Sequence, residues 1–360
     1  MGAQPLTLGN VEALAAAQLD PDWLEYFAGG AGDERTLRDN LSAFRSWRLR
    51  QQILCGIESV STATTVLGQN VSTPIVVAPV GYLRMAHADG EEGMARAAAA
   101  CGAAICLSTF AMASTADVAQ AAPGGTRFLQ LYVFRDRGIT DELIAQALDA
   151  GYTALFLTVD LPVLGSRDRE RQIAWTFPEE SIPAVRYALG RGVAGEGLSM
   201  LDPTLDWSYL ERLSGSVSVP VVVKGVLDPD DAVRAADHGA AGVVVSNHGG
   251  RQLDGAVSPL DALPAIVAAI EDRVPVLIDG GIRRGSDVVK AIALGARAVL
   301  IARPQLWGLA VAGEAGVAHV LAIYRSEIDR VMGLLGASSL DALRRLDLLV
   351  PHAAQAATEG

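Results

Sequence analysis

The chain has 360 residues and half of them are apolar, so it can bury a large core, in one α/β domain or in two domains of ordinary size. Its net charge of -12, without any run rich in lysine and arginine, argues against binding nucleic acid or an anionic membrane. The cysteines Cys55, Cys101 and Cys106 lack metal-ligand spacing, which indicates a reducing compartment and no metal site. Because the first residues lack the pattern of a secretory signal and we find no apolar stretch as long as a membrane span, we expect a cytoplasmic protein.

A helical cap is expected at residues 1–70, where DPDWLEYFAGGAGDERTL (20–37) is typical of a helix, a glycine break and a second helix. From residue 74 onward, a short apolar run, a turn and an alanine-rich stretch with helical spacing recur. Eight such runs are present, at 74–79, 103–108, 127–132, 154–160, 220–224, 242–247, 275–280 and 297–302. Continuous apolar runs indicate strands buried on both faces, and eight in succession favour a (β/α)8 TIM barrel over a doubly wound sheet.

The domain boundaries follow from this count. We predict one α/β domain, 1–360, in which residues 74–310 form the barrel and 311–360 form C-terminal helices. The connection after the fourth strand is too long for an ordinary loop, and residues 168–218 contain the interrupted stretches FPEESIP and GRGVAGEGLS. We expect a mobile lid here, with a disordered insertion that takes no part in catalysis as the alternative.

Side chains capable of chemistry follow the strands at the end where a barrel builds its active site. In chain order they are Ser108, Gln130, Tyr132, Thr158, Asp160, Lys224, His248, Arg251, Asp279 and Arg303. The sequence therefore predicts one active site at this end of the barrel.

The sharpest signal is SNHGGRQLDG at 246–255, directly after a predicted strand. A histidine side chain has an ordinary pKa of about 6.5, so His248 suits proton abstraction at neutral pH. A lone histidine is more often structural, but Arg251 supplies a clamp for a carboxylate and Asp160 can orient the imidazole ring. The other histidines lack such neighbours, and we expect them to be structural or at the surface: His87, His238, His319 and His352.

Two further features predict a bound cofactor or phosphate. Lys224 ends the apolar strand PVVVK, so it contacts a cofactor or forms a Schiff base with a carbonyl substrate, with a plain salt bridge as the alternative. DGGIRRGSD at 279–287 and IARP at 301–304 supply backbone N–H groups, a helix N-terminus, Arg283 and Arg303. Phosphates bind barrels at this place, after strands seven and eight.

With these residues in view, the chain resembles the flavin-dependent 2-hydroxy-acid oxidases and dehydrogenases, which include glycolate oxidase, lactate oxidase, lactate monooxygenase and mandelate dehydrogenase. The likeness covers nearly the whole chain. Its motifs are YFAGGAGDE, APVGYLRMAHADGE, LSTF, FLQLYVFRDR, LTVDLPVLGSRDR, VVVKG, SNHGGRQLDG, DGGIRRGSDVVKAIALGARAV and RPQLWGLA. It implies an FMN-dependent enzyme that oxidises a small-molecule (S)-2-hydroxy acid to the 2-oxo acid.

The resemblance also implies roles for individual residues. His248 would take a proton, Asp160 would stabilise its imidazolium form, and Tyr132 would hydrogen-bond the substrate hydroxyl. The substrate carboxylate would be held by Arg167, Arg251 and Tyr26, with Phe110 beside the substrate. Lys224 would stabilise the anionic reduced flavin, and Ser246 would lie near the base. The remaining FMN contacts would be Ala78, Pro79, Val80, Gly81, Ser108, Gln130, Thr158, Asp279, Gly280, Gly281, Arg283, Ala302 and Arg303.

Departures from the family concern specificity. Many relatives have Thr or Ile at the position of Val80, Trp at the position of Phe110 and Gly at the position of Ala302. Two segments are more similar to the hydroxymandelate oxidases than to glycolate oxidase: VAPVGY, which includes Tyr82, and the AGG of YFAGGAG. This similarity implies an aromatic or bulky substrate. The C2 hydrogen leaves either as a proton or as a hydride while His248 removes the hydroxyl proton, and both routes need the same residues.

The electron acceptor and assembly are further expectations. Membrane-bound dehydrogenases of the family carry an apolar insertion in the lid region. The corresponding segment here, AVRYALGRGVAGEGL, is short and interrupted by glycines. We therefore expect molecular oxygen as the electron acceptor and hydrogen peroxide as a product. The alternatives are a dehydrogenase that reduces a quinone, a lactate-monooxygenase-like enzyme and, outside the family, a flavin-free barrel lyase with Lys224 as its Schiff base. The resemblance implies a homo-oligomer, specifically a tetramer.

Overall fold

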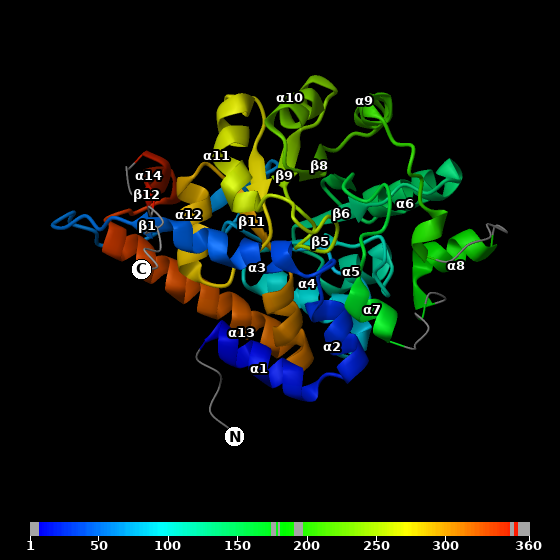
Figure 1. Ribbon diagram of the computed structural model, residues 1–360, viewed down its shortest axis with the longest axis horizontal. Helices are drawn as coiled ribbons and strands as arrows, with labels where there is room; N and C mark the ends of the chain where they lie inside the picture. The colour runs from blue at the N-terminus through cyan, green and yellow to red at the C-terminus, as the bar shows by residue number, and fades with distance from the viewer. Residues whose placement is uncertain (1–6, 174–177, 179–180, 191–196, 346–348, 352–360) are drawn as a thin grey trace, which may run out of the picture.

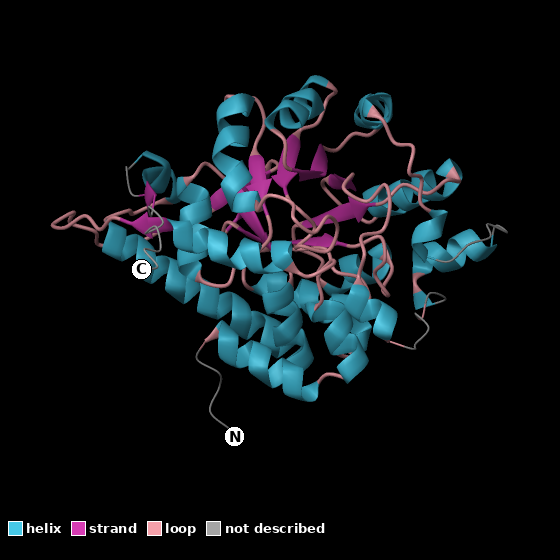
Figure 2. Ribbon diagram, viewed as in Figure 1, coloured by secondary structure: helices cyan, strands magenta, loops and turns pink. Residues whose placement is uncertain are grey.

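The centre of the molecule is a closed barrel of eight parallel strands with helices around it (Figures 1 and 2). The structure is a computed structural model that describes residues 7–173, 178, 181–190, 197–345 and 349–351. The strands follow one another around the barrel in chain order, and the last pairs with the first. They are β4 (Ile75–Val77), β5 (Ala104–Leu107), β6 (Arg127–Leu131), β7 (Leu155–Thr158), β8 (Val221–Val226), β9 (Gly242–Val245), β10 (Val276–Ile278) and β11 (Ala298–Ile301). The predicted (β/α)8 barrel is confirmed: seven of the predicted runs contain one of these strands, and the run at 220–224 overlaps β8, which extends two residues further.

The strands are apolar on both faces because both faces are buried. Successive side chains of a strand point to opposite sides of the sheet. Phe128 and Phe156 belong to one apolar cluster, that of the barrel interior, and their rings stack with centroids 5.4 Å apart. Their neighbours Leu129 and Leu155 belong to the larger cluster between the strands and the surrounding helices. This explains why the strands appear in the sequence as continuous apolar runs.

Helices cover the barrel from outside. Capping side chains set several of their starts: Asp136 and Asp228 accept N–H groups from the first turn of the helices that follow them. Because Asp136 is the cap, α6 begins directly after it, at Arg137. The helices that follow the strands are α4 (Gly90–Ala100), α5 (Thr115–Ala121), α6 (Arg137–Asp149), α10 (Pro229–Asp237), α11 (Pro259–Ile270), α12 (Gly285–Ala293) and α13 (Arg303–Leu335).

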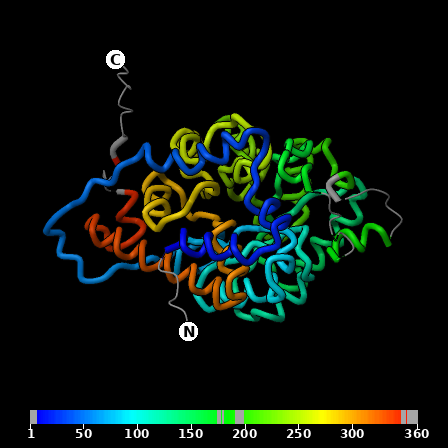
Figure 3. The backbone as a smooth tube through the Cα atoms, turned by 60° about the horizontal axis from the view of Figure 1, so that its bottom comes forward, coloured from blue at the N-terminus to red at the C-terminus, as the bar shows by residue number. Residues whose placement is uncertain are grey.

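The N-terminal segment is helical only in its first part. The predicted helix, break and helix are present as α2 (Pro21–Ala28) and α3 (Arg35–Ser42), which α1 (Leu8–Gln18) precedes. α1 packs against α13, and Figure 3 shows this blue segment beside the orange one. From Trp47 to Val71 the prediction of helix differs from the structure, because residues 64–71 form a hairpin whose turn has positive φ at Leu67 and Gly68. The remaining short elements are η1 (Ala43–Ser46), β1 (Trp47–Leu49), β2 (Thr64–Val66), β3 (Gln69–Val71), η2 (Leu83–Met85), α14 (Leu340–Arg345) and β12 (Leu349–Pro351).

The connection after β7 carries helices in its described part. These are α7 (Asp168–Gln172), α8 (Pro183–Gly190), η4 (Gly197–Met200) and α9 (Trp207–Ser216). α7 lies next to α2 at the active-site end of the barrel (Figure 1). The stretches FPEESIP and GRGVAGEGLS lie only in part within the described residues, so the predicted lid motion stays a prediction.

By length and composition alone, α13 is long and apolar enough to cross a membrane, which the sequence analysis did not anticipate. Of its most apolar window, 61% is buried inside the protein, where it packs against α1, α4 and α12. The backbone at Ala312 and Gly313 is not helical, so α13 is two helices that meet at a kink. Asp89 caps the second helix by accepting the N–H of Glu314 at 2.9 Å. Its apolar character is therefore explained by burial in the core.

Candidate active site

Three strand ends bring His248, Asp160 and Tyr132 together. Nδ1 of His248 lies 2.9 Å from Oδ1 of Asp160, and Nε2 lies 3.3 Å from the Tyr132 hydroxyl. His248 has a φ of 58°, a left-handed conformation that is costly for a residue with a side chain and is often found at functional sites. Gly225 makes room for Asp160, since a Cβ at this glycine would lie 2.6 Å from that of Asp160. The predicted partnership of His248 with Asp160 is therefore present in the structure.

The surroundings fix the protonation of this group. Burial, aided by Lys224 and Arg167, lowers the pKa of His248, while Asp160 acts in the opposite direction. Burial raises the pKa of Asp160, but His248 and Lys224 outweigh it, and the pKa lies below its ordinary value. At neutral pH the carboxylate is thus ionised and the imidazole neutral, so Nδ1–H donates to Asp160 and Nε2 accepts from Tyr132. Nε2 is therefore the basic atom.

Tyr132 keeps its proton. Burial, together with Asp160, raises the pKa of its hydroxyl, and Arg167 and Arg251 only partly offset this. The hydroxyl is therefore a hydrogen-bond donor at the basic atom of His248. Its ring lies 5.4 Å from that of Phe110, between centroids.

Lys224 is a buried cation. Its Nζ lies 3.1 Å from Oδ2 of Asp279 and donates to Oγ of Ser246 at 3.0 Å. Burial lowers the pKa of Lys224, but Asp279 and Asp160 outweigh burial and raise it above the ordinary value. A Schiff base requires a neutral amine, so this arrangement opposes the lyase alternative. The salt bridge named as the alternative is present, and the contact of Lys224 with a cofactor stays a prediction.

Two guanidinium groups lie beside these residues. Arg251 donates through Nη1 to the carbonyl oxygens of Tyr26 and Gly29, each at 2.7 Å, and its guanidinium lies 5.0 Å from the Tyr26 ring centroid. Arg167 precedes α7 and donates through Nε to the Arg251 carbonyl at 3.5 Å. Both arginines influence the pKa of Tyr26 and of Tyr132, so both act on the same small volume.

Glu170 of α7 was not among the residues predicted from the sequence. Its carboxylate lies 2.7 Å from Nη2 of Arg251 and 3.5 Å from Nη1 of Arg167, and therefore bridges the two guanidiniums. The available signal was its spacing of three residues from Arg167, which directly precedes the helix that carries Glu170.

The residues expected around the isoalloxazine ring lie on adjacent strand ends. Gln130 accepts from Oγ of Ser108 at 3.3 Å and donates to Oγ1 of Thr158 at 3.0 Å, so one hydrogen-bonded row crosses β5, β6 and β7. Ala78, at the end of β4, donates its N–H to the carbonyl of Ile301. Pro79, Val80 and Gly81 follow it, and a Cβ at Gly81 would lie 3.1 Å from the Phe110 carbonyl oxygen. Ala302 follows β11 on the neighbouring strand.

The late strands carry an excess of positive charge. Burial, followed by Arg251 and Arg283, lowers the pKa of Arg303 to about 9. Its nitrogens donate to the carbonyl oxygens of Phe27, Gly249 and Gly29 at 2.9–3.1 Å. An anion at this place would relieve the repulsion among the guanidiniums.

The neighbouring loop provides close backbone approach and an unused acceptor. Gly281 has a φ of 78°, and a Cβ there would lie 1.9 Å from the Asn40 carbonyl oxygen, so only glycine fits. Oδ1 of Asp279 is buried without a hydrogen-bond partner among the described residues. A ligand with a phosphate and a hydroxylated chain, as in FMN, satisfies both this oxygen and the cationic cluster.

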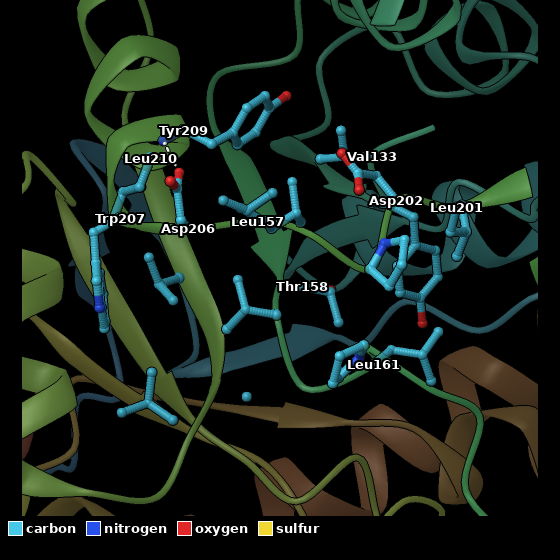
Figure 4. A pocket seen from close by; sticks show the side chains of 18 of the residues that line it. Val133, Leu157, Thr158, Leu161, Leu201, Asp202, Asp206, Trp207, Tyr209 and Leu210 are labelled. Atoms are coloured by element: carbon cyan, nitrogen blue, oxygen red, sulfur yellow. Dashed lines mark hydrogen bonds between the residues drawn. The ribbon is translucent and has the colours of Figure 1, made fainter. Parts of the chain in front are cut away.

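An apolar cavity of about 290 Å³ lies behind the site (Figure 4). Leu157 and Val223 of the barrel form one wall, and Trp207 and Leu210 of α9 form another. Tyr132 also lines it, so the cavity adjoins the site described above.

Known proteins with similar sequences and folds agree with this description. The profile described as FMN-dependent dehydrogenase matches residues 15–349. An L-lactate oxidase from Nostoc sp. is 43% identical over 94% of this chain and 96% of its own, and human 2-hydroxyacid oxidase 1 is 40% identical over 94% and 95%. A mandelate oxidase structure with (S)-2-phenylpropionate has a TM-score of 0.90 and 37% identity, and covers 98% of this chain and 100% of its own. The chain therefore belongs to the FMN-dependent dehydrogenase family.

Proposed function

We propose that this flavoenzyme oxidises an (S)-2-hydroxy acid to the 2-oxo acid and passes the electrons to molecular oxygen. The observation that carries the proposal is the convergence of the His248–Asp160 pair and the guanidiniums of Arg167 and Arg251 around Tyr132. A base next to a carboxylate clamp is what a 2-hydroxy acid requires, since its acidic group must be held while a proton is removed beside it. Relatives named as lactate oxidase and 2-hydroxyacid oxidase support the reaction class.

In this proposal the chain binds and orients the acid. Arg167 and Arg251 donate to the substrate carboxylate, with the Tyr26 ring beside them. The Tyr132 hydroxyl, which lies 3.3 Å from Nε2 of His248, donates to the substrate hydroxyl oxygen. Nε2 accepts the proton that the substrate loses, and Asp160 stabilises the imidazolium that forms.

The cofactor site is assigned on the same grounds. Lys224, Ser108, Gln130, Thr158 and Ser246, with the 78–81 segment and Ala302, would surround the isoalloxazine ring of FMN. Asp279, Gly280, Gly281, Arg283 and Arg303 would hold its ribityl phosphate. When bound at this site, FMN would supply the acceptor for the two electrons that the substrate loses. The positive charge of Lys224 favours the build-up of negative charge nearby.

The preferred substrate in this proposal is aromatic or otherwise bulky. The rings of Tyr26 and Tyr82 meet edge to face at 5.7 Å, and Phe110 and Tyr132 stand 5.4 Å apart, so aromatic side chains enclose the site. Structures of mandelate oxidase support this choice, whereas the lactate oxidase relative favours L-lactate as the second candidate.

Oxygen consumption separates the proposed reactions. We expect oxygen uptake and hydrogen peroxide in equal amounts when the holoenzyme turns over (S)-mandelate, with slower turnover of L-lactate. Rapid dye reduction without oxygen uptake would assign a dehydrogenase instead. The decarboxylated acid as the main product would assign a monooxygenase.

We also propose that the protein acts in the cytoplasm as a homo-oligomer. This rests on the family resemblance and on the few cysteines. Light scattering coupled to size-exclusion chromatography tests the assembly, and a monomeric mass at assay concentration would overturn it.

A further inference from the structure

Glu170 occupies a buried place between the two guanidiniums of the carboxylate site. The side chains of Glu170, Arg167 and Arg251 are only 12%, 11% and 14% exposed. Oε1 of Glu170 lies 2.7 Å from Nη2 of Arg251, while both carboxylate oxygens lie 3.5 Å from Nη1 of Arg167. One acidic group thus contacts both arginines that the proposed function assigns to the substrate.

The two arginines depend on Glu170 to different degrees. Arg251 is anchored without it, because Nη1 donates to two backbone carbonyl oxygens at 2.7 Å and the guanidinium packs on the Tyr26 ring. Among the described residues Arg167 has no such anchor, since its one other hydrogen bond there is the 3.5 Å contact from Nε to the Arg251 carbonyl. The position of the Arg167 guanidinium therefore rests mainly on Glu170.

The helix that carries Glu170 is held by other contacts. Arg169 pairs with Glu25 at 3.1 Å and with Glu34 at 2.7 Å, which ties α7 to the N-terminal helices. Before the helix, the N–H of Gly32 donates to the Ser166 carbonyl at 2.7 Å. The backbone here should therefore survive a change at position 170.

Glu170 leaves a donor for a second carboxylate. Arg251 also hydrogen-bonds the Tyr26 side chain, whereas the Nη2 group of Arg167 makes no hydrogen bond within the described part of the chain. Two guanidiniums and one carboxylate carry a net charge of +1, which a monocarboxylate substrate neutralises. The substrate can thus bind without displacing Glu170.

We propose that Glu170 is a positioning residue that holds Arg167 beside Arg251, so that both guanidiniums donate to the carboxylate of the substrate. The inference rests on the proposed function for the identity of that carboxylate. Glu170 itself touches neither the substrate nor the cofactor and acts through Arg167.

The test is Glu170→Gln in the holoenzyme, with Glu58→Gln at the exposed Glu58 as the matched control. The dissociation constant of phenylacetate, an unreactive monocarboxylate, is measured from the change in flavin absorbance, beside that of the neutral phenylacetamide. We expect Glu170→Gln to weaken phenylacetate binding about 10- to 100-fold, since a charge-assisted contact is lost, and to leave phenylacetamide unchanged. KM for (S)-mandelate should rise by a similar factor while kcat changes little. Propionate, propionamide and L-lactate replace these ligands if wild type excludes the phenyl ring.

Double variants identify the route of the effect. In the Arg167→Met background, adding Glu170→Gln should reduce the affinity for phenylacetate little further. In the Arg251→Met background, the same addition should weaken phenylacetate binding further. Glu170→Asp keeps the charge and should restore part of the affinity, which covers the case of a poorly folded Gln variant.

Three results would overturn the inference. Tighter phenylacetate binding in Glu170→Gln would mean that Glu170 competes with the substrate. An equal loss for the acid and the amide would mean a general structural role, and no loss for either would remove any role. Failure of every 2-hydroxy acid to reduce the wild-type flavin would instead refute the proposed function, and phenylacetate binding would still report on Glu170.

Discussion

Replacing Asp160 by Asn removes the negative charge beside Nδ1 of His248 and preserves the shape of the side chain. In the wild type, the 2.9 Å hydrogen bond fixes the ring with Nε2 as the free basic atom and stabilises the imidazolium that forms. A hydrogen bond to a charged group contributes about 1.5–3 kcal/mol. If the variant loses all of this energy in the transition state, the rate of flavin reduction falls about 10- to 150-fold.

The pH dependence gives this prediction a second readout. The neutral imidazole is the active form, so the rate rises with pH through the pKa of His248. Burial already lowers this pKa from 6.5, and Asp160 acts to raise it. Loss of the carboxylate should therefore move the acidic limb of the pH–rate profile to lower pH, and the rate on its plateau should fall. Anaerobic stopped-flow reduction measures both, and a reduction rate within twofold of wild type with an unshifted limb would refute the reasoning.

The remaining predictions concern the base, the phosphate site and the buried ion pair. His248→Ala should retain FMN but lose reduction by the substrate in anaerobic mixing, and undiminished turnover would refute the base assignment. Arg283→Ala should lose FMN on gel filtration, whereas Arg284→Ala, whose side chain pairs with Glu327 at the surface, should keep it; equal retention would contradict the phosphate assignment. Lys224→Met leaves the Asp279 carboxylate buried without its partner, so the free energy of unfolding should drop by about 3–5 kcal/mol in denaturant titration. An unchanged midpoint of the unfolding transition would contradict this expected loss of stability.

The barrel could be predicted because each strand is buried on both faces and therefore leaves a continuous apolar run. The same rule placed His248, Asp160 and Lys224 together, since the carboxyl ends of barrel strands meet. The hairpin at 64–71 was missed because its strands have three residues each, too few for a periodic signal. The long apolar span of α13 escaped notice because Gly313 and Glu314 interrupt it, while the structure continues past them through a kink.

Contacts between distant segments set the limit of prediction within the site. The sequence left three roles open for Lys224: contact with a cofactor, a Schiff base or a salt bridge. Only the fold shows that Asp279 lies beside it. The pairing of Glu170 with Arg251 joins residues 81 positions apart, and no local pattern indicates it. Local spacing identified the reactive groups, whereas their charge states depend on such long-range neighbours.

The central claim is that these residues act on one 2-hydroxy acid beside bound FMN. Anaerobic titration of the purified holoprotein with (S)-2-hydroxy acids, aliphatic and aromatic, tests it most directly through the visible absorbance of the flavin. We expect a yellow protein whose absorbance is bleached by one equivalent of acid, with one equivalent of 2-oxo acid formed. A colourless protein that cannot be reconstituted with FMN, or a flavin that stays oxidised with every acid, would contradict it.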